Sequence, residues 1–216
     1  MGSGRLSYSV TVKESTSQLI AAATEAIEKE INVRLKKWEK RLRQHFAPIL
    51  IDVLKKQPEY ESIISGDLRE HFGILDAHVK LDKILDTWGS TIKIVSKPVK
   101  FSKQSSSGGI KIEAIRSNFA DVMGLDAGYQ MTEKGTALHW LEWLLLAGDK
   151  VIIRDYIIDE VSDMRGRAGK QIMVEWKGGS WSVPLGFRGN EANNWTTRAV
   201  DAAEDTFMKL FKGILL

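Results

Sequence analysis

The stretch that decides the fold is residues 163–200, DMRGRAGKQIMVEWKGGSWSVPLGFRGNEANNWTTRAV. A basic, glycine-containing segment opens it, and two β-prone runs follow on either side of Gly178-Gly179. A Gly-Gly pair between two such runs predicts a hairpin turn. Val183-Pro184 predicts the end of the second strand, because proline cannot donate to a sheet. Asn193 or Asn194 is then the expected N-cap of a last helix.

Tryptophan is concentrated in the same stretch. Three of the seven tryptophans of the chain lie there, Trp176, Trp181 and Trp195. Large rings with one polar edge suit packed cores and protein–protein interfaces. No group of residues in the stretch has the pattern of a catalytic centre. We therefore expect a framework for packing and for contact with other subunits.

Composition places the chain among ordinary globular proteins. Of its 216 residues 43% are hydrophobic and 27% are charged, and the net charge is only +3. Such a charge does not demand a nucleic-acid partner. Disulfides and thiolate chemistry are excluded because cysteine is absent. The longest apolar segment, residues 140–147, is too short to cross a bilayer, so no membrane association is expected.

A long amphipathic helix is predicted from Ser17 onward. Its apolar residues recur three or four positions apart, as one stripe on a helix does: Ile20, Ala23, Ile27, Ile31, Leu35, Trp38, Leu42 and Phe46. Pro48 predicts a kink or a break. Such a helix has more surface than one small core covers, so we expect it to pack against a neighbouring subunit. Residues 1–58 form the expected N-terminal arm and helix, and residues 59–216 the expected α+β core.

Two basic segments are candidate contact sites. Six of the ten residues from Arg34 to Arg43 are basic, and Lys36, Lys40 and Arg43 among them are candidate phosphate contacts. The alternative is a solvated helix face in which Glu39 pairs with a neighbouring cation. The second segment is a glycine-containing loop whose candidate contacts to DNA or to an acidic partner are Arg165, Arg167 and Lys170. The alternative there is a solvated loop.

The middle of the chain predicts mixed elements. A helix whose apolar face is Leu75, Val79, Leu81, Leu85 and Trp88 should end near Gly89. A strand over 90–101, a polar loop over 102–109 and a strand over 110–115 predict a long hairpin. Residues 137–148 predict a short buried helix, and the nearly continuous apolar run 151–159 a central strand. The expected class is α+β: a long N-terminal helix, an antiparallel sheet with extended hairpins, a short buried helix and a C-terminal helix.

No catalytic, cofactor or metal site is predicted. His139 and Glu142 lie one helical turn apart, but no third ligand is near them in the sequence. The segment 165–171 is not a Walker A loop, because Gln171 stands where that loop needs Ser or Thr. The carboxylates are scattered as in any chain of this size. We therefore expect a protein that is not an enzyme.

Two segments resemble the head-to-tail joining proteins of tailed bacteriophages, the neck or tail-completion proteins. The first is IISGDLREHFGILDA at 63–77, and the second is 165–200. The matching residues of the second segment form a small-residue loop, a strand, a Trp-x-Val-Pro step and a helix start: Arg167, Gly169, Ile172, Met173, Trp181, Val183, Pro184, Gly189, Asn194, Trp195, Thr197, Arg198 and Ala199. The chain departs from the pattern at Arg165-Gly166, where a Ser-Arg pair is more usual.

The resemblance implies a structural virion protein without enzymatic activity. It implies an α+β subunit that forms a homo-oligomeric ring of six or twelve copies around the DNA channel. The implied partners are portal or connector proteins, tail tube or terminator proteins, and passing double-stranded DNA bound without sequence preference. Trp181, Pro184, Asn194, Trp195 and Arg198 are the implied structural motif. Assembly would take place in the host bacterial cytoplasm and the product would lie in the virion neck or tail.

Two other interpretations stay open from the sequence. One is a DNA-binding or metal-dependent DNA-processing protein that uses the Arg34–Arg43 helix face. The other is a component of a contractile, phage-tail-like particle without a capsid.

Overall fold

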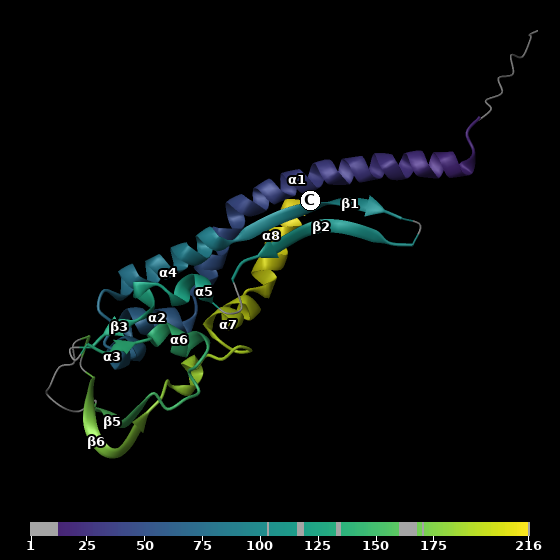
Figure 1. Ribbon diagram of the computed structural model, residues 1–216. Helices are drawn as coiled ribbons and strands as arrows, with labels where there is room; N and C mark the ends of the chain where they lie inside the picture. Colours follow the sequence, from purple (N-terminus) through teal and green to yellow (C-terminus); the bar gives the residue numbers. More distant parts are fainter. Residues whose placement is uncertain are drawn as a thin grey trace, which may run out of the picture. The chain divides into compact units, whose positions relative to one another are not determined.

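The computed structural model describes residues 13–102, 104–115, 119–132, 135–159, 168–169 and 171–215 (Figure 1). The chain forms two compact units. The first comprises Met1–Glu39 and Val95–Lys111, and the second comprises Lys40–Ile94 and Ile112–Leu216. The predicted α+β class is confirmed, with a long N-terminal helix, antiparallel pairs of strands, and short and C-terminal helices.

Helix α1 runs without interruption from Thr16 to Lys55, so it does not break at Pro48. Pro48 is exposed. On the solvent side of a helix, the carbonyl that loses its donor can bond to water instead, which reduces the cost of an interior proline. The following helix, α2, begins at Pro58, where proline is well tolerated because the first helical N–H has no partner in the helix.

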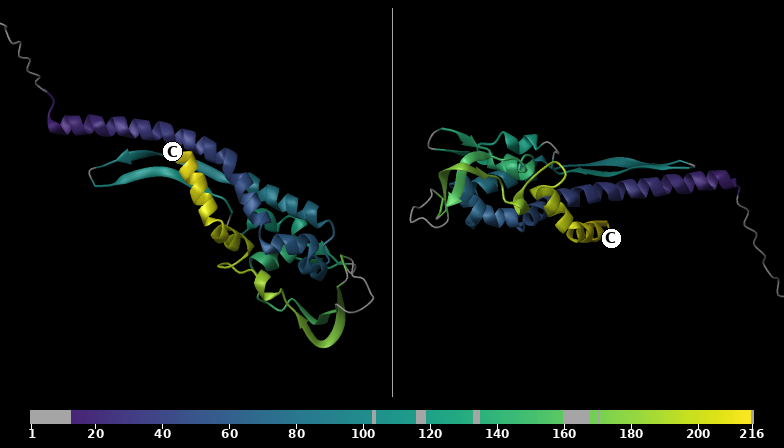
Figure 2. Two further views of the ribbon diagram at one scale, coloured as in Figure 1. Left: turned by 180° about the vertical axis from the view of Figure 1, so that it is seen from behind. Right: turned by 90° about the horizontal axis from the view of Figure 1, so that it is seen from below.

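Strands β1 (Lys93–Phe101) and β2 (Ser106–Glu113) pair as the predicted hairpin, and their residues within 95–111 belong to the first unit. Strand β2 begins inside the segment that was expected to be loop. Gly108 makes this possible, because it adopts a φ of +103° and a Cβ there would collide with the carbonyl of Pro98. Figure 2 shows the hairpin as a long ribbon beside the N-terminal half of α1.

Polar side chains of α1 bind the backbone of β1. Asn32 accepts from the N–H of Val99 at 2.7 Å and donates to the carbonyl of the same residue at 3.0 Å. Glu28 accepts from the N–H of Phe101 at 2.6 Å. These contacts satisfy groups that an edge strand otherwise leaves to water or to another chain. The helix thus covers one edge of the hairpin through side chains.

The same unit exposes much of the apolar stripe of α1. Ile20 is 62% exposed and Ile27 is 52% exposed. Further along α1, in the second unit, Leu42, Phe46 and Leu50 are buried. The stripe predicted from the periodicity is therefore continuous in sequence, but only its C-terminal part is covered.

Three helices follow α1 in the second unit: α2 (Pro58–Ser65), α3 (Asp67–Phe72) and α4 (Ala77–Thr91). Gly73 ends α3 in the left-handed region with a φ of 61°. Helix α4 buries Ala77, Leu81, Ile84, Leu85 and Trp88.

The prediction for this helix was wrong in two places. Leu75 and Val79 are exposed, and α4 continues past Gly89.

Gly89 has a packing role instead of the predicted capping role. A Cβ on this residue would lie 3.1 Å from the Cδ1 atom of Ile51. Glycine therefore allows close approach of α4 to the C-terminal half of α1.

Short elements complete the centre of the second unit: α5 (Ala120–Met123), the 3-10 helix η1 (Asp126–Gly128), β3 (Gln130–Met131), β4 (Ala137–Leu138) and α6 (Trp140–Leu145). Strands β3 and β4 pair antiparallel. Helix α6 is the predicted buried helix, with Trp140 and Leu144 fully enclosed. Lys80 donates to the carbonyl of Tyr129 at 2.7 Å, and burial lowers the pKa of its ammonium group.

The last strands are β5 (Ile153–Asp159) and β6 (Ile172–Trp181), which pair antiparallel. The predicted hairpin at Gly178-Gly179 is wrong, because both glycines lie within β6. They belong to an irregularity between the pairs Arg154↔Ser180 and Tyr156↔Glu175. There Asp155 accepts from the N–H of Gly178 at 2.8 Å. Strand β5 is also not a central strand, since among the described strands it pairs with β6 alone.

Within the described ranges no helix is long and apolar enough to cross a membrane.

Candidate functional site

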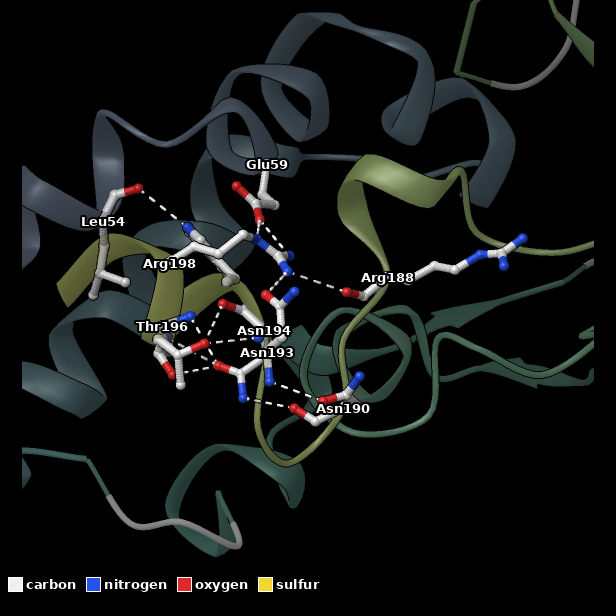
Figure 3. A network of polar contacts seen from close by, with 10 residues as sticks. Leu54, Glu59, Arg188, Asn190, Asn193, Asn194, Thr196 and Arg198 are labelled. Atoms are coloured by element: carbon white, nitrogen blue, oxygen red, sulfur yellow. Dashed lines mark hydrogen bonds and ion pairs between the residues drawn. The ribbon is translucent and has the colours of Figure 1, made fainter. Parts of the chain in front are cut away.

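The C-terminal stretch builds a polar network at the start of α7 (Trp195–Ala202), shown in Figure 3. Of the two predicted candidates, Asn193 and Asn194, Asn194 is the N-cap. Its side-chain oxygen accepts from the N–H groups of Thr196 and Thr197, each at 3.1 Å. The hydroxyl of Thr197 accepts in return from the N–H of Asn194 at 2.8 Å, which completes a capping box. The helix start is therefore determined by local sequence.

Arg198 connects this cap to a helix far away in the sequence. Its Nε atom donates to Oε1 of Glu59 at 2.8 Å, and its Nη2 atom lies 2.6 Å from the same oxygen. The Nη1 group donates to the carbonyl of Arg188 at 3.2 Å and to Oδ1 of Asn193 at 2.6 Å. The Glu59 side chain is 0% exposed and that of Arg198 is 25% exposed. Three separate segments thus converge on one guanidinium group.

Trp195 lies beneath the network and is fully buried. Its Nε1 atom donates to the carbonyl of Leu54 at 3.2 Å, and its ring meets that of Trp88 edge-to-face, with centroids 5.7 Å apart. One side chain therefore joins α7 to the ends of α1 and α4 through both packing and a hydrogen bond.

Trp181 is the centre of a second aromatic cluster. Its ring meets those of Phe72 at 5.5 Å, His71 at 5.7 Å and Trp143 at 6.4 Å. Pro184 follows at the start of the 3-10 helix η2 (Leu185–Phe187), where its carbonyl accepts from the N–H of Phe187 at 2.9 Å. The predicted motif residues Trp181, Pro184, Asn194, Trp195 and Arg198 are thus all brought into packing or capping positions.

Two glycines let the motif pass close to α6. Gly148 donates to the carbonyl of Gly189 at 2.9 Å, and Gly189 donates to that of Trp143 at 3.1 Å. A Cβ on either glycine would collide with the backbone of the neighbouring segment. The Gly189 of the sequence motif is therefore explained by close backbone approach.

The candidate cationic contacts fall into two groups. Arg165, Arg167 and Lys170 lie outside the described residues. On α1, Lys36 and Lys40 are exposed, whereas Arg43 donates to the carbonyl of Ile94. Arg43 thus stabilises the fold as well as contributing charge.

The sequence did not predict a groove that the structure forms in the second unit. It has a volume of about 840 Å³. Its walls come from α1, the segment 112–115, Phe119, and helices α7 and α8 (Glu204–Leu215). One signal was available, namely the run of Phe207, Met208 and Phe211 on α8.

Metal binding finds no support in the part of the chain that the structure describes. No group of three or more His, Cys, Asp or Glu residues there could hold an ion. The ring of His139 packs against that of Tyr129 at 5.7 Å, and Glu142 is exposed.

Comparison with known proteins identifies no relative: no family model, no curated protein and no solved structure matches the chain.

Proposed function

We propose that this chain is a structural virion protein of the neck or tail-completion complex of a tailed bacteriophage. In this proposal, copies of the chain form a homo-oligomeric ring that joins the head connector to the tail around the DNA channel. The basis is the resemblance of residues 63–77 and 165–200 to such proteins. The proposed protein acts by assembly, and one face of its ring binds the connector while the other faces the tail.

The observation that carries the proposal is the uncovered apolar surface of the first unit. Leu19, Ile20, Ile27 and Val33 are exposed on α1, and Val95 and Phe101 are exposed on the hairpin. Exposed apolar side chains that gather on one element mark interaction surfaces more often than isolated ones do. A subunit of a closed ring needs two different contact surfaces, because its contacts are heterologous. The helix and hairpin supply candidates for them.

Lys36 and Lys40 support the part of the proposal that concerns DNA. Both side chains are exposed. Exposed lysines contact phosphates without reading bases, which suits a channel through which any sequence must pass. The same residues would serve the competing hypothesis, a DNA-binding or DNA-processing protein that acts as a monomer.

Native mass spectrometry combined with negative-stain imaging distinguishes the two hypotheses. The proposal predicts closed rings, of six or twelve copies, alone or on addition of the connector protein. It also predicts weak DNA binding that disappears at moderate salt. A monomer that cuts DNA, or that binds it tightly with a steep salt dependence, would contradict the proposal and support the alternative.

A further inference from the structure

The groove of the second unit has an apolar floor. The rings of Phe46 and Phe207 stack there, with centroids 5.3 Å apart and an interplanar angle of 23°. Around them lie further apolar side chains, of which Val200 and Met208 are exposed. The exposed fraction of Met208 is 47%. Water therefore covers a concave surface that would gain free energy from an apolar partner.

The rim of the groove is acidic. Glu191, Asp201 and Glu204 line it, and none of the described residues that line it is Lys or Arg. Among the described residues, none of the three carboxylates forms an ion pair. The whole chain has a net charge of +3. The groove is thus opposite in sign to the molecule that carries it, which directs cationic partners to this place.

We propose that this groove binds a basic amphipathic segment of another protein. The apolar face of the segment would cover Val200, Met208 and the Phe46–Phe207 stack, and its Lys or Arg side chains would pair with the three carboxylates. This is the helix-in-groove mode of peptide recognition. The proposal does not depend on the function proposed above.

A second copy of this chain is a poor occupant. Its most exposed apolar element in the described part is the N-terminal half of α1. Over residues 16–35 that element carries three acidic side chains, Glu25, Glu28 and Glu30, against two basic ones, Lys29 and Arg34. Docked into the groove, these carboxylates would face Glu191, Asp201 and Glu204. Like charges opposed in this way disfavour the complex.

The test uses two synthetic amphipathic helices with leucine on one face. One has lysine and the other has glutamate on the polar face, and each carries a fluorophore for anisotropy titrations against the full chain. We expect the lysine peptide to bind and the glutamate peptide not to bind. Binding of the lysine peptide should weaken as salt is raised, because the carboxylates are at the rim.

Two variants locate the binding. The triple substitution Glu191→Gln, Asp201→Asn, Glu204→Gln should lower the affinity for the lysine peptide by about tenfold or more. Each exposed ion pair that is lost should account for roughly a few-fold of that decrease. Its matched control removes three exposed carboxylates elsewhere in the unit, through Asp86→Asn, Glu142→Gln and Asp149→Asn, and should leave the affinity unchanged. Met208→Arg should also abolish binding, whereas Leu185→Arg, at an exposed site outside the groove, should not.

Three results would overturn the proposal. The first is equal or tighter binding of the glutamate peptide. The second is equal weakening by the control triple variant, which would indicate attraction to the whole surface. The third is a change of oligomeric mass in Met208→Arg, measured by sedimentation, which would assign the groove to a second copy. Thermal melts of both arginine variants serve to confirm that each is folded.

Discussion

Glu59 depends on one side chain for its charge balance. It is fully buried, and Oε1 accepts from Arg198, while Oε2 has no hydrogen-bond partner among the described residues. Removing one member of a buried ion pair leaves the other charge uncompensated, at a cost of about 3–5 kcal/mol. We therefore expect Arg198→Met to lower the free energy of unfolding by about that amount, measured by urea denaturation.

The double variant Glu59→Gln, Arg198→Met tests whether the loss of stability arises from the unpaired charge of Glu59. It removes both charges, so it should recover a large part of the stability that the single variant loses. Arg34→Met serves as the control, because its pair with Glu30 is solvent-exposed, and it should leave the unfolding midpoint unchanged. A double variant no more stable than Arg198→Met alone would show that the loss does not arise from the buried charge.

Residue roles were predictable where they depend on close neighbours in the sequence. The cap was predicted at Asn193 or Asn194, and Thr197, three residues after Asn194, is the local signal that favours Asn194. The partner of Arg198 was not predictable, because Glu59 lies 139 residues away. Nothing in the local pattern distinguishes Glu59 from the exposed Glu61 beside it.

At the scale of elements, the contact between α1 and β1 depends on polar residues that interrupt an apolar stripe. Asn32 makes the most complete contact, because it bonds both the N–H and the carbonyl of Val99. We expect Asn32→Ala to lower the hydrogen-exchange protection of the Val99 amide by about fivefold to tenfold, which corresponds to the loss of about 1 kcal/mol for one hydrogen bond. Mass spectrometry or NMR of the exchanging amides provides the measurement.

Glu25→Ala is the matched control for this prediction. Glu25 lies on the same helix and is exposed, and it forms no hydrogen bond with a described residue of the hairpin. The Val99 amide should keep its protection in that variant. If Asn32→Ala left the protection of Val99 unchanged, the hairpin would be held by β1–β2 pairing alone, and the side chains of α1 would have no part in ordering it.

The elements show which sequence signals were sufficient. The long helix and a hairpin over 90–115 were predicted, because periodicity over many residues leaves few alternatives. The Gly178-Gly179 hairpin was wrong, because a glycine pair suits an irregular strand as well as a turn. Gly178 has a φ of 85°, and a Cβ on Gly179 would press on the carbonyl of Tyr156. The choice between these uses depends on the partner strand, which the local sequence does not specify.

At the scale of the whole molecule, the sequence could not show how much of the α1 stripe would be covered. Ile20 and Ile27 have the same spacing and hydrophobicity as Leu35 and Leu42. The first two are exposed and the last two buried. Periodicity predicts which residues share a face, but it does not predict whether the same chain or another one covers that face. The groove of the second unit was missed for the same reason.

The exposed stripe leads to the prediction that bears most directly on assembly. Burying an isoleucine contributes about 1.5–3 kcal/mol, and in a ring this contribution recurs at every subunit contact. Replacing Ile20 and Ile27 together by lysine should therefore shift the native mass distribution from rings to monomers. Because both side chains are already exposed, the circular dichroism spectrum and melting temperature of the monomer should change little.

Val79→Lys is the control, since Val79 is exposed on α4 in the other unit and the same change of chemistry there should leave the rings intact. Comparison of the two variants separates the loss of a specific contact from general repulsion between more cationic subunits. The double variant adds two charges per copy and the control adds one, so both are measured over a range of salt. Repulsion weakens when salt is raised. Rings that return at high salt would show that charge alone disrupts them, and rings that stay absent would assign the contact to the apolar face of α1.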